Sequence, residues 1–275
     1  MGPVRMGRFA ATVCALLCLA LSAAAAPDGK GIIRKMNEAM KGAMTTGKSY
    51  QAVIDMNMSM GQMGNMVSTM DLKVLPGKKM RITTTPSKQS TGVFAMAATQ
   101  GAMQMVDDGK ALWIYQPAVK QYMKQPSQIA KMGPSAMRNL PGVGNQLDEQ
   151  ILKDSKVVVK GTKQVQGRQA YIVQVTPNKP VRGVQTMTMT IDSATYRLRG
   201  IATEASQAMA PNQPPQRMKM NLTFRNERVG EAIPDSVFRF TPPPGATEMK
   251  MPAMGGAPGA GAPGRPGGPA PGAPK

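Results

Sequence analysis

The sequence predicts a mainly β protein that has one N-terminal helix and one large antiparallel sheet, which must curl or close. Two patterns within the 275 residues predict this fold. Near the N-terminus, apolar residues recur at intervals of three and four, as on one face of a helix. Farther along, apolar and polar residues alternate over about ten short runs separated by Gly, Asn and Asp, as in strands with one buried face.

Residues 1–26 have the order of a secretory signal peptide. Residues 1–8 carry two arginines, residues 9–21 are apolar, and small residues follow. Crossing a bilayer needs about 20 apolar residues, so this shorter run favours a cleaved signal over a membrane anchor. We expect cleavage between Ala24 and Pro27 and export of the remaining chain.

The segment from residue 28 to residue 48 is expected to form an amphipathic helix. Its apolar side chains return once per helical turn, so that they share one face. These side chains are Ile32, Ile33, Met36, Met40 and Met44.

After this helix the apolar period changes to two, which predicts strands. Asp108-Gly109 predicts a tight hairpin turn, and Gln166-Gly167 predicts another. The alternating runs cover residues 52–60, 66–74, 80–85, 101–107, 111–115, 121–124, 156–160, 170–176, 186–191, 197–203 and 219–225.

Two segments depart from the alternating pattern. Residues 126–151 contain Pro134 and Pro141 among apolar positions, which predicts short helices and a loop that could cover an opening. Residues 252–275 consist of Pro, Gly and Ala with one Met, one Arg and one Lys, so they cannot bury a core and predict a disordered tail. The folded domain is therefore expected over residues 27–251.

The composition excludes several chemistries. The chain has no His, which excludes an imidazole base, a His-containing triad and a His-ligated metal. Its two cysteines lie in the predicted signal. The adjacent acids Asp107-Asp108 and Asp148-Glu149 are better explained by a turn or a helix end, because neighbouring strand residues point to opposite faces. We therefore expect no catalytic residue, no metal site and no cofactor.

The net charge of +19 is spread over turns and the polar phase of the strands, which is typical of a solvated surface. The excess could favour an anionic membrane surface or an acidic partner. The chain has no basic motif interleaved with aromatic residues, so nucleic acid is not expected as a partner.

Methionine occupies most of the apolar phase of the strands, and three interpretations stay open. The residues could form an ordinary core, a deformable interior that accepts flexible apolar ligands, or a thioether site for Cu(I). Alternate residues of a strand lie about 7 Å apart, which works against convergence on one copper ion. The methionines are Met56, Met58, Met60, Met66, Met70, Met187, Met189, Met218 and Met220.

Four stretches in order along the chain resemble the LolA-type periplasmic carriers of outer-membrane lipoproteins. Residues 108–117 are similar to a hairpin of that family, in which a D-G-K turn leads into an L-W-x-Y-x-P strand. Residues 75–86 resemble its third strand and residues 191–198 a later strand. Residues 233–245 resemble its closing strand with a P-x-G finish.

The resemblance implies an incomplete antiparallel β-barrel, covered by the N-terminal helix and short lid helices around an apolar cavity. It further implies a monomeric periplasmic carrier of lipoprotein acyl chains or other lipids. Its partners would be sorting proteins of the inner and outer membranes, with transient membrane-surface contact. Family members commonly have an Arg that helps to hold the lid shut, and this sequence has Leu75 there. The same fold also occurs in lipid or lipoprotein sensors, which is the alternative function.

For a carrier, we expect the apolar phase of the central strands to line the cavity. Trp113 and Tyr115 are expected to pack within the barrel wall. The lid would carry Ile129, Met132 and Met137. The expected lining is Ile54, Met56, Met58, Met70, Leu72, Met187, Met189, Met220 and Leu222.

Overall fold

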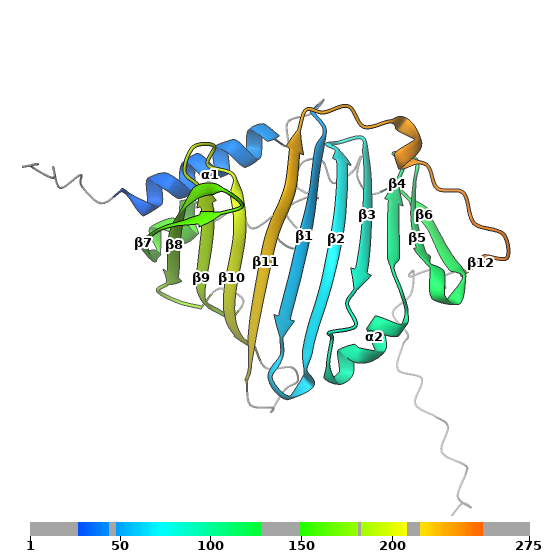
Figure 1. The fold of residues 1–275 in the computed structure, drawn as a ribbon, viewed down its shortest axis with the longest axis horizontal. Helices are drawn as coiled ribbons and strands as arrows, with labels where there is room; N and C mark the ends of the chain where they lie inside the picture. The colour runs from blue at the N-terminus through cyan, green and yellow to red at the C-terminus, as the bar shows by residue number, and fades with distance from the viewer. Residues whose placement is uncertain (1–26, 44–47, 128–148, 181–182, 208–214, 250–275) are drawn as a thin grey trace, which may run out of the picture.

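One open, curled sheet of twelve strands forms most of the molecule, and a single long helix packs against it (Figure 1). The computed structural model describes residues 27–43, 48–127, 149–180, 183–207 and 215–249. The strand order is β12-β6-β5-β4-β3-β2-β1-β11-β10-β9-β8-β7. The predicted fold class, a mainly β curled sheet with an N-terminal helix, is confirmed, and the sheet does not close into a barrel.

The strands follow the alternating runs of the sequence closely. They are β1 Tyr50–Ser59, β2 Asn65–Leu75, β3 Lys79–Pro86, β4 Met103–Asp107, β5 Ala111–Gln116, β6 Gln121–Pro126, β7 Ser155–Val165, β8 Arg168–Pro177, β9 Val184–Asp192, β10 Leu198–Gln207, β11 Gln216–Val229 and β12 Thr247–Glu248.

Helices make up a smaller part of the described residues, and α1 is the only long one among them. They are α1 Gly29–Ala43, α2 Ala95–Thr99 and α4 Glu149–Lys153, with 3-10 turns η1 Gly61–Met63, η2 Gly92–Phe94, η3 Pro117–Val119 and η5 Asp235–Phe238.

Helix α1 begins where the sequence predicts. The Asp28 carboxylate accepts hydrogen bonds from the backbone N–H groups of Lys30 and Gly31, at 3.0 and 2.9 Å, and so satisfies the first helical donors. Its described part reaches Ala43, and residues 44–47, over which the prediction continues, lie outside the described residues. Its apolar face is buried, and Figure 1 shows it lying against the half of the sheet that contains β7 to β11.

Two meanders meet in the centre of the sheet. Strands β1 to β6 pair in sequence order on one side, and β7 to β11 do so on the other. The junction pairs β1 with β11, for example Ile54 with Phe224 and Met56 with Leu222. The first and last long strands of the domain therefore lie side by side in the middle of the molecule.

The β7–β8 hairpin folds back over its own side of the sheet. Gln166 and Gly167, with φ of 50° and 74°, form its tight turn as predicted. A register shift between Val159 and Gly161 interrupts the ladder, and such bulges bend a strand. The Gln166 side chain then donates a 2.9 Å hydrogen bond to the carbonyl of Phe224, although β9 and β10 lie between their strands.

The C-terminal segment after β11 returns to the other end of the sheet. Lys79 pairs with Asp235 at 2.6 Å, and Arg81 donates to the carbonyl of Val237 at 3.1 Å. Residues 233–245 form the turn η5 and irregular chain rather than the closing strand that the resemblance implies, because their four prolines lack N–H donors. Pairing resumes only at β12, which lies parallel to β6.

Candidate functional site

The nine residues predicted to line a cavity all lie on the inner face, which we define as the sheet face against which α1 packs. Strand register brings them together from β1, β2, β9 and β11. Ile54 faces Met70, Met56 faces Leu222 and Met58 faces Met220. Across β10, Ile201 faces Met189 and Thr203 faces Met187.

Six of these nine residues are buried, and the other three are only partly buried. Ile54, Leu72, Met189 and Leu222 are at most 2% exposed, and they belong to the same packed cluster as the apolar face of α1. Met70 and Met187 are each 8% exposed. Met56, Met58 and Met220 are only partly buried. The accessible part of the predicted lining is therefore its methionine end.

Three methionines form a row across this accessible end. On β1, Met58 pairs with Met66 of β2 on one side and with Met220 of β11 on the other. All three side chains are partly buried. Directly opposite residues have Cβ atoms about 5 Å apart, which is closer than the spacing along a strand. Strand pairing thus brings together thioethers from three strands, a proximity that the sequence pattern alone does not predict.

Two hydroxyl groups are set into the same apolar face, and the sequence pattern did not single them out. Ser68 lies opposite Met56, and Thr203 lies between Met187 and Met220. They are 4% and 6% exposed, and neither hydroxyl oxygen has a hydrogen-bond partner in the part of the chain that the structure describes. Both occupy the apolar phase of their strands, where a polar residue is the sequence signal of a buried polar group.

An aromatic cluster lies at the β5–β6 end of the sheet and includes Trp113 and Tyr115 of β5. The ring of Phe240, from the C-terminal segment, is 5.5 Å from each of them, and Tyr122 is 5.9 Å from Trp113. Lys124 lies over the indole, 4.7 Å from its centroid. Both residues therefore pack against other rings of the wall, as the sequence predicts.

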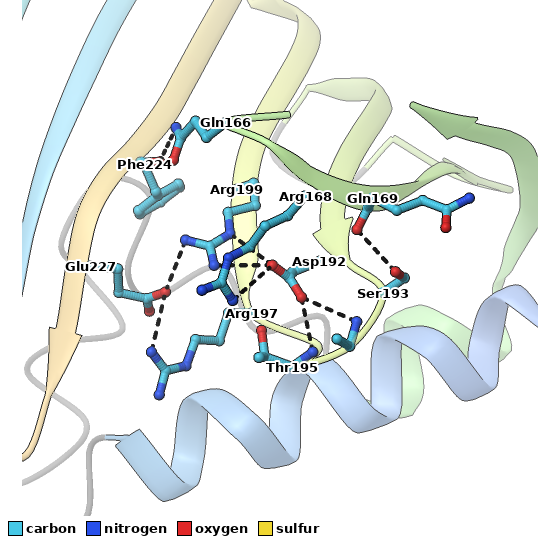
Figure 2. A network of polar contacts seen from close by, with 11 residues as sticks. Gln166, Arg168, Gln169, Asp192, Ser193, Thr195, Arg197, Arg199, Phe224 and Glu227 are labelled. Carbon is cyan, nitrogen blue, oxygen red and sulfur yellow. Dashed lines mark hydrogen bonds and ion pairs between the residues drawn. The ribbon is translucent and has the colours of Figure 1, made fainter. Parts of the chain in front are cut away.

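A network of ion pairs lies near α1 (Figure 2). Arg199 of β10 donates to Asp192 at 3.0 Å, and its other nitrogen lies 3.7 Å from Glu227 of β11. Arg197 lies 4.0 Å from Glu227. The side chains of Asp192 and Glu227 are 1% and 2% exposed. These ion pairs link the β9–β10 turn to β11.

A bulge in β11 places Glu227 in this network. Asn226 has a φ of 52°, and the register with β1 shifts between Gln51 and Val53. Burial raises the pKa of Glu227, an effect that Arg197 and Arg199 only partly offset. The pKa of Tyr50 is raised as well, first by burial and then by the nearby Glu227.

Asp192 has the opposite behaviour. Burial opposes its ionisation, but the backbone N–H groups of Thr195 and Ala194 and the guanidinium of Arg199 outweigh that effect and lower its pKa. The network therefore contains one carboxylate stabilised by hydrogen bonds and one that is poorly compensated.

Asp108 and Glu149, one residue of each acid pair, have the structural roles that the sequence suggests, and Asp148 lies outside the described residues. Asp108 accepts hydrogen bonds from the backbone N–H groups of Lys110 and Ala111 at the hairpin turn. Glu149 is the first residue of α4 and pairs with Arg34 of α1 at 2.8 Å. In the described ranges, no group of three or more Asp, Glu, His or Cys residues could hold a metal ion.

Several predicted features lie outside the described residues: the signal peptide, the lid residues Ile129, Met132 and Met137, and the tail from residue 252. Of the helices within the described part, none is long and apolar enough to cross a membrane.

Comparison with known proteins finds similar folds at low sequence identity. No family model and no curated protein matches the sequence. Among solved structures, a LolA superfamily protein from Nitrosomonas europaea is 12% identical over 78% of this chain and 99% of its own, with a TM-score of 0.31. An outer membrane lipoprotein-sorting protein domain from Vibrio parahaemolyticus is 13% identical over 76% of this chain and 95% of its own, with a TM-score of 0.29.

The Mycobacterium tuberculosis lipoprotein LppX is 14% identical over 74% of this chain and 96% of its own, with a TM-score of 0.43. The similar structures thus include the group of proteins that the sequence motifs resemble. These identities and TM-scores are too low to carry a function over, so the function must be inferred from residues of this chain.

Proposed function

We propose that the protein is a non-catalytic periplasmic carrier that binds acyl chains of lipoproteins or other lipids and delivers them to the outer membrane. The observation that carries this proposal is the accessible methionine end of the inner face, where Met56, Met58 and Met220 lie side by side. Covering an acyl chain there is favourable, because each buried CH₂ contributes about 0.8 kcal/mol.

Methionine suits a carrier that must also release its cargo. Its side chain is unbranched and flexible, so it adapts to differently shaped apolar partners without fitting one of them tightly. The rigid end of the face, under α1, would keep the sheet curled while the methionine end changes shape. Ile129, Met132 and Met137 would act as the lid. Removal of the two signal arginines from the net charge of +19 leaves +17 on the exported chain, which would support brief contact with anionic membrane surfaces.

A substitution on the accessible end tests the binding site. Met58→Asp places a charge where the acyl chain would lie, so we expect lipid binding to fall by at least about tenfold. The measurement is displacement of a fluorescent fatty-acid probe from the mature protein. Asn57→Asp is the matched control, because Asn57 is the exposed neighbour on the opposite face of β1. Equal loss in both variants, with both folded by circular dichroism, would remove the inner face as the binding site.

A copper-binding protein is the second candidate, favoured by the row of Met66, Met58 and Met220. Soft thioether ligands suit Cu(I), and three adjacent strands could bring three of them to one ion. Native mass spectrometry of protein taken from the periplasm separates the candidates, since it would show a bound lipid or a bound copper ion.

A lipid sensor would bind the same ligand without moving it. Transfer of a labelled acyl lipid between donor and acceptor vesicles therefore distinguishes the carrier from the sensor. A carrier raises the transfer rate in proportion to its concentration, whereas a sensor retains its lipid and leaves the rate unchanged.

A further inference from the structure

The two buried hydroxyls of the inner face differ from the four other buried serine hydroxyls in the described ranges. Ser90, Ser127 and Ser155 are 6–8% exposed, and each donates a hydrogen bond to a protein acceptor, at 3.2, 2.7 and 2.6 Å. Ser49 likewise donates to the carbonyl of Glu231. Ser68 and Thr203 are equally buried but have no partner among the described residues. The two exceptions are the two that lie among the methionines.

The neighbours of these hydroxyls are unable to compensate them well. Ser68 is flanked by Met66 and Met70 on β2 and faces Met56 on β1. Thr203 is flanked across the strands by Met187 and Met220. A thioether is only a weak acceptor, so each hydroxyl has a donor that the protein leaves unused. A buried polar group without a partner costs stability, and Ala or Val would have avoided that cost at these positions.

We propose that Ser68 and Thr203 donate hydrogen bonds to carbonyl oxygens of the bound lipid, so that the ligand class is acyl chains joined through an ester or an amide. This inference rests on the proposed function and narrows its ligand. Ser68 and Thr203 are three strand spacings apart, about 14 Å on a flat sheet, so they would serve two different carbonyl groups. Ether-linked chains of the same length lack the carbonyl and would bind less well.

Matched lipids test this selectivity on the mature protein. The ester is 1-palmitoylglycerol, the amide is N-palmitoylethanolamine, and the ether is 1-O-hexadecylglycerol, which has the head group and chain length of the ester. We expect the wild-type protein to prefer the ester or the amide over the ether by about 3- to 10-fold for each hydrogen bond. A preference for the ester or for the amide shows which linkage the protein binds, and either preference supports the proposal.

The variants Ser68→Ala and Thr203→Val remove the donors with little change in volume. We expect them to abolish the preference, to leave ether binding unchanged and to leave the melting temperature unchanged or higher. Thr223→Val is the control, because Thr223 is exposed on the opposite face of β11. A lower melting temperature in the first two variants would show that the hydroxyls have a structural partner and would overturn the proposal.

The outcomes also separate this inference from the function on which it rests. Equal binding of ester, amide and ether by the wild-type protein overturns the carbonyl selectivity and leaves the acyl-chain carrier standing. Binding of none of the three overturns both.

Discussion

At the scale of single residues, the ion network contains two carboxylates whose surroundings shift their pKa in opposite directions. Asp192 receives hydrogen bonds from two backbone N–H groups and from Arg199, which stabilise its charge. Glu227 is equally buried but lies 3.7 Å or more from its arginines, and its Oε2 atom accepts no hydrogen bond among the described residues. The contribution of each to stability therefore depends on pH with opposite sign.

This difference predicts opposite pH trends for two variants. Because the pKa of Glu227 is raised, the contribution of Glu227 to stability falls as the pH rises above about 4.5, so the stability of Glu227→Gln relative to wild type should increase over that range. The lowered pKa of Asp192 means that Asp192→Asn should cost about 3 kcal/mol at neutral pH. That cost should shrink as the pH falls below 3.8, because the Asp192 carboxylate of the unfolded chain then takes up a proton that the lowered pKa still keeps off the folded protein. Urea unfolding from pH 3 to pH 8 measures both, and parallel trends would contradict the assignment.

At the scale of elements, helix α1 is positioned by a close approach to β7. A Cβ atom added at Gly29 would lie 2.8 Å from Cγ1 of Val157, so glycine allows this contact between helix and strand. Gly42, near the other end of α1, has nothing within 4 Å of an added Cβ. The same substitution should therefore act differently at the two ends of one helix.

We predict that alanine changes the free energy of unfolding in opposite directions at Gly42 and Gly29. Gly42→Ala should raise the free energy of unfolding by up to about 1 kcal/mol through helix propensity. Gly29→Ala should lower it by about 1 kcal/mol or more, because Val157 must shift. Denaturant titration measures the free energy of unfolding of both variants. A higher free energy for Gly29→Ala would contradict the prediction, because it would mean that Val157 can shift without destabilising the protein.

Much of the element pattern could be predicted from sequence, and the gaps have physical reasons. Alternation reports which side of a strand is buried, so the runs that became β1 to β11 were visible, as was the start of α1. Strand β12 has only two residues, too few to show a period. The short α2 lies in a segment without apolar periodicity, and its Met96 is 73% exposed.

The candidate site was predictable only in part. The period places Met58 and Met220 in the apolar phase of their strands, but nothing local indicates that they become neighbours, since their pairing depends on contact between distant strands. Glu227 was missed because the bulge at Asn226 shifts the phase by one residue. Ser68 could not be recognised from the sequence, because a hydroxyl without a hydrogen-bond partner is visible only in three dimensions.

At the scale of the whole molecule, the pairing of β1 with β11 means that the chain must be nearly complete before its centre can form. A mature chain that ends at residue 215 lacks β11, which leaves β1 and β10 without their shared partner. We expect that chain to remain unfolded, whereas removal of residues 250–275 should preserve the far-ultraviolet circular dichroism and the cooperative melt. A folded product from the shorter chain would show that the two meanders are independent units.

The open sheet has a consequence for the behaviour of the protein at high concentration. A closed barrel has no free strand edge, but this sheet has two, and an unprotected edge can recruit the edge of another copy. On one side the last strand is only two residues long, which offers little backbone to pair with. On the other, Lys156, Lys160 and Lys163 are exposed along β7 and repel the same lysines of a second molecule. Part of the large positive charge thus protects the protein against edge-to-edge aggregation.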